Sequence, residues 1–160
     1  GAMDCCLELN SLSKAHNMAG WRIGMVAAQA EVISQILKVK SQMDSGMFKP
    51  LQLAAVQALK QGPEWFRELN EEYRRRRVLA GEIFDLIGAA YQKDSTGMFL
   101  WGKVSEGTGE QVSDRLLYEA GVFITPGFIF GKNGSQYIRI SLCAKPEVLA
   151  AAKHKIEKIW

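Results

Sequence analysis

The stretch Ser11-Leu-Ser-Lys-Ala-His-Asn-Met-Ala-Gly-Trp-Arg-Ile-Gly24 carries more potential chemistry than any other part of the chain. Lys14 follows a predicted strand and stands among serine hydroxyls, and Arg22 lies two residues from a glycine on either side. Glycine permits tight turns and close backbone approach, and a guanidinium group matches an anion such as phosphate. A neutral lysine amine attacks carbonyl groups. The segment therefore indicates a site for a phosphate and a carbonyl; the alternative is a surface lysine on a serine-rich loop.

The spacing of this segment resembles the cofactor-lysine motif of class I and II aminotransferases, which are fold-type I enzymes that use pyridoxal 5′-phosphate (PLP). In that motif S-x-S-K is followed, after a short variable stretch, by G-x-R-x-G. The resemblance implies that Lys14 forms the Schiff base with the cofactor aldehyde and serves as catalytic general base. It also implies that Ser11 and Arg22 hold the cofactor phosphate. The matched positions are Ser11, Ser13, Lys14, Gly20, Arg22 and Gly24.

A second region of resemblance lies near the C-terminus. Residues 121–127 followed by residues 137–141 are similar to the family's small-domain segment. The resemblance implies that Arg139 binds the α-carboxylate of the substrate, and guanidinium and carboxylate groups do pair through two parallel hydrogen bonds. The alternative is an edge-strand arginine that faces water.

The resemblance implies an enzyme that transfers an amino group between an amino acid and a 2-oxo acid. Aspartate, alanine and diaminopimelate transaminases are the first candidates. Lyases and decarboxylases of fold type I share the same lysine motif and the same carboxylate arginine. A non-enzymatic alternative is the aminotransferase-like sensor domain that some bacterial transcription regulators carry.

The periodicity of apolar residues predicts an α/β chain with a small α+β second half. We expect strands at 4–12, 23–28, 98–101, 122–125 and 137–142, and helices at 32–43, 51–59, 63–88, 109–120 and from 146 onward. With the resemblance, residues 1–3 are read as an expression-tag remnant and 4–62 as the C-terminal remainder of the large PLP-binding domain. Residues 63–88 are then the bridging helix, and 89–160 the small C-terminal domain.

The family's lysine strand is predicted almost at the start of this chain, where Cys5-Cys6-Leu7-Glu8-Leu9 is typical of a buried strand. The fold expected is therefore the C-terminal part of the PLP-dependent transferase fold, with an incomplete large domain. We expect such a fragment to be inactive alone and to bind PLP weakly or not at all. Apolar surface that the rest of the domain would cover favours self-association or a homodimer, with the strand at 4–12 as an unprotected edge.

Composition narrows the class of protein. The chain has 160 residues, of which 48% are hydrophobic and 23% charged, which is typical of a globular protein rather than a disordered one. No apolar run reaches the roughly 20 residues of a membrane span, and the net charge of +3 is too small to indicate nucleic acid. Three cysteines favour a reducing, cytoplasmic setting. We therefore expect neither a nucleic-acid nor a membrane partner.

Other prominent side chains receive structural interpretations. The run of four arginines at 74–77 points all around a helix axis, and Glu71 and Glu72 are spaced to pair with it. We interpret it as a solvated, salt-bridged helix surface. The two histidines lack partners at ligand spacing, so no metal site is predicted. Four aromatic residues are candidates for lining a substrate cleft, but packing in the core or between domains is the favoured interpretation, and they are left out of the predicted site: Phe99, Trp101, Phe128 and Phe130.

Overall fold

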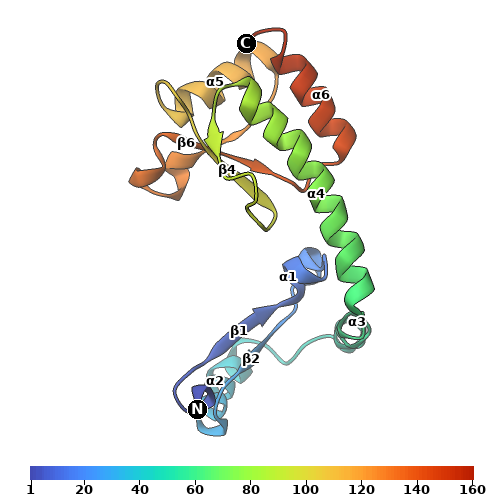
Figure 1. The fold of residues 1–160 in the computed structure, drawn as a ribbon. Coiled ribbons are helices and arrows are strands. Elements are labelled where there is room, and N and C mark those ends of the chain that lie inside the picture. The colour runs from blue at the N-terminus through green and yellow to red at the C-terminus, as the bar shows by residue number, and fades with distance from the viewer. The chain divides into compact units, whose positions relative to one another are not determined.

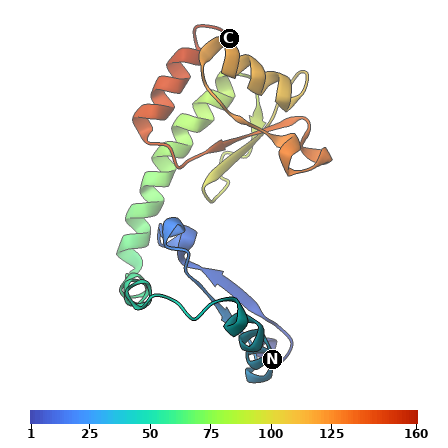
Figure 2. The ribbon, with the colours of Figure 1, turned by 180° about the vertical axis from the view of Figure 1, so that it is seen from behind.

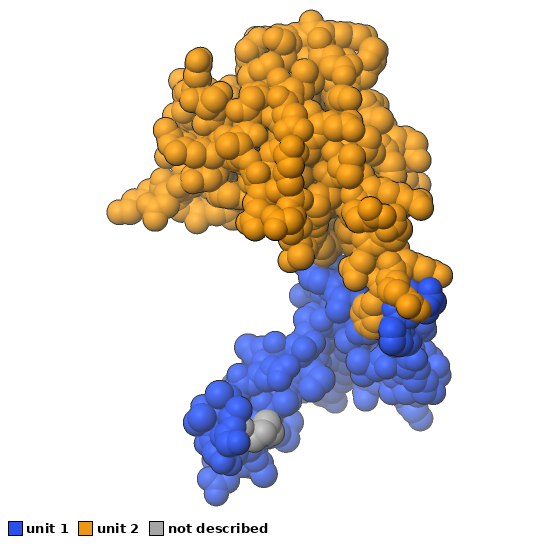
Figure 3. Space-filling model, in the orientation of Figure 1, with its two compact units in different colours: residues 1–64 blue, residues 65–160 orange. Residues whose placement is uncertain are grey.

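The computed structural model describes residues 1–160, apart from the side chain of Met3. The chain divides into two compact units, residues 1–64 and residues 65–160 (Figure 3). Each unit has its own cluster of buried apolar side chains. The predicted division at residues 62 and 88 concerns functional domains of a larger fold and stays a prediction.

The first unit consists of a two-stranded antiparallel sheet and short helices (Figure 1). Strands β1 and β2 pair so that Ser11 lies opposite Gly24. A Cβ atom at Gly24 would stand 2.6 Å from the carbonyl oxygen of Asn10, so only glycine allows this approach. The elements are η1 Ala2–Asp4, β1 Glu8–Ser11, α1 Leu12–Ala15, η2 Ala19–Trp21, β2 Gly24–Ala27, α2 Ala30–Met43 and α3 Lys49–Leu59.

One prediction for this unit is wrong. Residues 4–12 were expected to form a buried strand, but the strand is limited to Glu8–Ser11 and all four residues are exposed. The cysteines that precede it are also exposed. A strand is buried only where another layer covers it, and β1 contributes no residue to the buried cluster of this unit.

The apolar core of the first unit is small. Its buried members are Leu12, Met18, Ile23 and Ala55. Helix α2 has an apolar stripe as predicted, yet none of its residues is buried. Most apolar side chains of residues 1–64 therefore remain in contact with solvent.

The second unit has a four-stranded sheet with the order β3-β4-β6-β5, in which all neighbours are antiparallel. Helices α4 and α6 lie side by side (Figures 1 and 2), and Lys153 on α6 donates to Glu82 on α4 at 3.0 Å. The elements are α4 Pro63–Leu86, β3 Ala90–Tyr91, β4 Phe99–Lys103, α5 Gly109–Ala120, β5 Thr125–Pro126, η3 Gly127–Phe130, η4 Lys132–Gly134, β6 Tyr137–Ser141 and α6 Pro146–Ile156.

The core of the second unit lies on one face of its sheet. Alternate residues of β4 and β6 point inward, as the sequence alternation predicted. The inward residues Leu100 and Ile138 are fully buried, and Phe84 of α4 packs with them. The outward face of the same two strands carries Phe99 and Trp101 of β4 and Arg139 of β6.

Local signals set the helix ends. Helix α5 starts with a capping box in which Thr108 and Gln111 exchange hydrogen bonds, and it ends at Gly121 in the left-handed conformation. Helix α4 stops before Gly88, whose φ is +70°. Beyond it, the amide of Ala89 donates to the carbonyl of Phe84 at 2.8 Å. This bond spans five residues, as in a Schellman ending.

The arginine run on α4 has two functions. Arg75 and Arg76 pair with Glu71 and Glu72, as predicted. Arg76 also donates to the carbonyl of Leu142 at 3.1 Å, and Arg77 donates to the hydroxyl of Ser95 at 3.1 Å. The interpretation as a purely solvated surface is therefore incomplete, because two of the four arginines fasten loops to the helix.

The strand predicted at 122–125 is much shorter than expected. Only Thr125 and Pro126 pair with β6. The amide of Val122 instead donates to the carbonyl of Leu116, as part of the ending of α5. Val122, the first residue of the predicted strand, therefore belongs to the end of helix α5.

Candidate functional site

The segment that carries the predicted lysine folds as a tight connection between β1 and β2. Ser11 is the N-cap of α1, and its hydroxyl oxygen accepts a hydrogen bond from the amide of Ser13 at 3.2 Å. The two serine hydroxyls are 2.9 Å apart. The amide of Leu12 donates to the carbonyl of Ile23 at 3.3 Å, which closes the connection.

Lys14 lies in the last turn of α1, directly after the strand, and it is exposed. None of the hydrogen bonds or ion pairs formed by the described residues engages its amine. The amine is therefore accessible to a carbonyl compound. Serine hydroxyls lie within the same short helix and at its N-cap.

Arg22 has a left-handed backbone, with φ 51° and ψ 48°. This conformation is uncommon for a residue other than glycine, asparagine or aspartate and costs about 1–3 kcal/mol. Its guanidinium group donates to the carbonyl of Ala19 at 3.0 Å. That bond uses one of the five N–H donors of an arginine. The remaining donors are available to an anion, and backbone strain of this kind often occurs at functional sites.

The side chains of this segment offer complementary chemistry. Two hydroxyls and a guanidinium group suit a phosphate ester, and an exposed amine suits an aldehyde. The chain therefore has, within residues 11–24, the chemistry that PLP requires from its phosphate and aldehyde contacts. The glycines contribute unequally, because Gly24 permits a close contact whereas nothing lies within 4 Å of a Cβ at Gly20.

Arg139 belongs to the second unit, on β6. This strand lies between β4 and β5, and Arg139 is opposite Trp101 on one side and Thr125 on the other. It is thus a residue of an interior strand rather than an edge strand. Its guanidinium carbon lies 4.2 Å from the ring centroid of Phe99 and 4.1 Å from that of Phe130.

The four aromatic residues discussed above were left out of the predicted site, with core or interdomain packing as the favoured interpretation. Their exposed fractions range from 37% for Phe99 to 50% for Phe130, so they do not belong to the buried core of the second unit. The alternation of β4 places Phe99 and Trp101 on the outward face. The sequence signal that could have indicated their exposure is the alternation of β4, which also predicted the strand.

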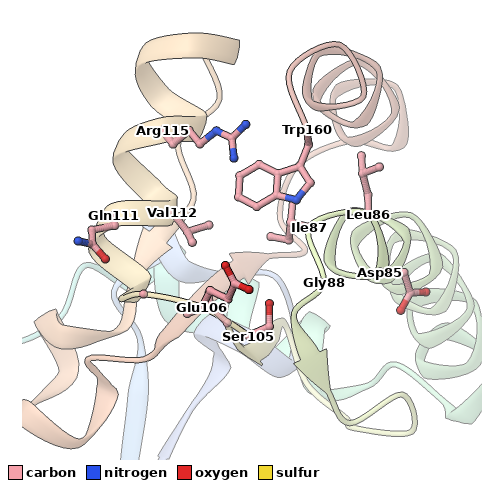
Figure 4. A pocket seen from close by; sticks show the side chains of 12 residues that line it. Asp85, Leu86, Ile87, Gly88, Ser105, Glu106, Gln111, Val112, Arg115 and Trp160 are labelled. Atoms are coloured by element: carbon pink, nitrogen blue, oxygen red, sulfur yellow. The ribbon is translucent and has the colours of Figure 1, made fainter.

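Two cavities lie in the second unit. The larger, of about 620 Å³, is bounded by the end of α4, the loop before α5 and the C-terminal Trp160 (Figure 4). None of the predicted site residues lines it. Its Arg115 lies over the Trp160 ring at 4.2 Å and donates to the carbonyl of Ile159 at 2.7 Å. The other cavity, of about 480 Å³, is mostly apolar and includes Arg139.

The described part of the chain contains no cluster of three or more histidine, cysteine, aspartate or glutamate side chains arranged to hold a metal ion. Nor is any helix within the described residues both long enough and apolar enough to cross a membrane.

Comparison with known proteins decides the family. The model for aminotransferase class I and II matches residues 2–156. The chain belongs to this family. Membership confirms the predicted fold class, a partial PLP-dependent transferase fold, and the dependence of the family's enzymes on PLP.

Individual relatives agree with this assignment. LL-diaminopimelate aminotransferase of Oleidesulfovibrio alaskensis is 40% identical over 160 residues, and that of Aquifex aeolicus is 39% identical. In both comparisons 99% of this chain and 41% of the relative are covered. The aromatic aminotransferase of Pyrococcus horikoshii OT3 is similar in structure, with a TM-score of 0.88 at 31% identity, and covers 99% of this chain and 44% of that one. This family member thus spans about two fifths of the length of its relatives.

Proposed function

We propose that this chain supplies the cofactor lysine and the substrate-carboxylate arginine of a PLP-dependent aminotransferase. The observation that carries the proposal is the fold of residues 11–24, where an exposed Lys14 shares one short connection with Ser11, Ser13 and Arg22. The family match over residues 2–156 supports it independently. The proposed reaction transfers an amino group between an amino acid and a 2-oxo acid.

Each residue has a distinct role in this proposal. Ser11 and Arg22 donate hydrogen bonds to the cofactor phosphate, and Lys14 holds the aldehyde through its Nζ atom. PLP, when bound, withdraws electrons from the α-carbon of the amino acid and so makes its proton removable. Once the amino group of the substrate has replaced Lys14 at the aldehyde, the freed Lys14 amine would take that proton as general base. Arg139 holds the substrate carboxylate by a bidentate pair.

LL-diaminopimelate is the amino donor that we propose to test first, because the curated relatives compared above carry that name. Structural neighbours include an aromatic aminotransferase and an aspartate aminotransferase. A panel of amino donors should therefore include aromatic and acidic amino acids. Such a panel also separates transamination from the lyase and decarboxylase alternatives.

The experiment uses the gene product that carries this chain, at its natural length, with PLP and a 2-oxo acid. We expect amino transfer that Lys14→Ala abolishes, because no other amine replaces the general base. Lys38→Ala, on the exposed surface of α2, is the matched control and should retain activity. Release of carbon dioxide or ammonia in place of a new amino acid would contradict the proposal, and so would full activity of Lys14→Ala.

We further propose that the protein works in the cytoplasm as a homodimer and that the 160-residue chain alone binds PLP weakly. Several exposed apolar side chains of the first unit support self-association: Leu37, Val39, Met43, Phe48 and Leu53. Sedimentation of the chain at rising concentration should reveal this association. Val39→Glu should reduce it, whereas a strictly monomeric chain would contradict it.

A further inference from the structure

The side chain of Arg139 is held between two phenylalanine rings. Its guanidinium carbon lies 4.2 Å from the ring centroid of Phe99 and 4.1 Å from that of Phe130, well inside the roughly 6 Å range of cation–π attraction. A guanidinium ion attracted to two rings at once has little freedom to change rotamer. The two rings therefore hold the charge in place.

The sheet and the turn before it produce this arrangement. Arg139 points to the outward face of β6, opposite Trp101, and Phe99 lies two residues before Trp101 on the same face of β4. The helical turn η3 brings Phe130 to the same place. Trp101 supports Phe130 by an edge contact with ring centroids 5.7 Å apart, and Tyr137 stacks on Trp101 at 5.3 Å. Phe130, one of the two rings next to Arg139, is therefore itself held by aromatic contacts.

The hydrogen-bond donors of Arg139 are left for a ligand. Its Nε atom is buried and has no hydrogen-bond partner in the structure. None of the ion pairs among the described residues includes Arg139. A phenylalanine ring offers no oxygen or nitrogen acceptor, so the two ring contacts leave the N–H donors of Arg139 without a conventional partner. A planar carboxylate that approaches edge-on meets two parallel donors.

We propose that Phe99 and Phe130 form an aromatic clamp, defined as these two rings, that positions Arg139 for a carboxylate. The clamp rests on the proposed function of Arg139 and adds two positioning residues to it. Binding a carboxylate to a free arginine side chain costs the loss of rotamer freedom. The clamp removes that cost before the ligand arrives, and it does so without occupying an N–H donor.

The experiment observes the Nε–Hε signal of Arg139 in the 160-residue chain labelled with ¹⁵N, assigned through Arg139→Lys, with acetate as the carboxylate probe. We expect the signal upfield of the other arginines because of ring currents, and we expect acetate to shift it. Phe99→Leu and Phe130→Leu should each lose the upfield shift and weaken acetate binding by about two- to tenfold. Phe99→Tyr and Phe130→Tyr keep the rings and should keep both properties.

Phe128→Leu is the matched control, because Phe128 lies on the same turn η3 and 44% of it is exposed. It should change neither the shift nor the affinity. Unchanged affinity in both leucine variants, with binding lost in Arg139→Lys, would overturn the clamp and leave the proposed role of Arg139 intact. Unchanged acetate binding in Arg139→Lys would instead overturn that role. Backbone amide spectra of each variant establish that the second unit is folded.

Discussion

At the scale of single residues, each side chain of the proposed site has its own local environment. Arg22 adopts a left-handed conformation that its residue type disfavours, and Lys14 stands exposed directly after a strand. Arg139 is held by rings rather than by hydrogen bonds. In each case the group expected to meet a ligand keeps donors or an amine available.

The residues proposed for the site were chosen from the sequence, whereas their surroundings could not be predicted from it. The motif fixed Lys14 and Arg22 by local spacing. The contact of Phe99 and Phe130 with Arg139 depends on strand register and on a turn, which connect positions far apart in the chain. Local patterns carry no information on such pairings, so packing was the favoured interpretation of the rings.

One residue-scale prediction concerns Tyr91. Burial raises the pKa of its phenol above 10.0, and the nearby Asp85 carboxylate raises it further. The folded state thus favours the neutral phenol, and this contribution to stability is complete below pH 10. It is lost as the pH rises from the unfolded pKa through the higher folded pKa. The free energy of unfolding of the second unit, measured with urea, should therefore fall above pH 10.

Tyr91→Phe tests whether ionisation of Tyr91 causes the loss of stability above pH 10, because phenylalanine keeps the ring and has no proton to lose. Its alkaline loss of stability should be smaller than that of the unmodified protein. An identical alkaline profile for the two proteins would show that Tyr91 does not contribute. Tyr73, whose phenol pKa burial also raises, offers a second substitution of the same kind.

At the scale of elements, the sequence predicted a helix correctly where residues at both of its ends mark the start and the stop. The capping box and the terminal glycine of α5 enclose the predicted range 109–120. Proline opens α4 and α6, as predicted. The strand predicted at 122–125 was wrong in extent, since the apolar run also serves the ending of α5. The burial of β1 was wrong because burial depends on what covers a strand rather than on its own residues.

Gly102 provides an element-scale prediction. It lies on the inward face of β4, where a Cβ atom would stand 2.8 Å from a ring carbon of the fully buried Phe84. Gly102→Ala should therefore lower the free energy of unfolding of the second unit by about 1–3 kcal/mol through overpacking. Urea denaturation measures this change. An unchanged free energy of unfolding in Gly102→Ala would refute the packing argument.

At the scale of the whole molecule, the two units differ in how much of their apolar surface they bury. Residues 65–160 enclose a core with fully buried members such as Leu116 and Leu142. Residues 1–64 bury only a small cluster, and α2 buries none of its residues. Stability that derives from burial is therefore concentrated in the second unit.

Hydrogen exchange should reflect this difference. Amides of β4, β6 and α5 should exchange slowly, close to the rate of global unfolding of their unit, because their opening exposes the core. Amides of α2 should exchange orders of magnitude faster. Mass spectrometry of peptides from the exchanged protein measures both, and equal protection of α2 and α5 would contradict the difference in burial.

The amine of Lys14 is the proposed attachment point for PLP. Incubating the chain with PLP, reducing it with borohydride and mapping the peptides reveals which lysine carries the pyridoxyl group, even when binding is weak. We predict labelling of Lys14 well above that of the exposed Lys38 and Lys49, reduced by inorganic phosphate and by Arg22→Gln. Labelling spread evenly over the lysines, with no effect of phosphate, would contradict the claim.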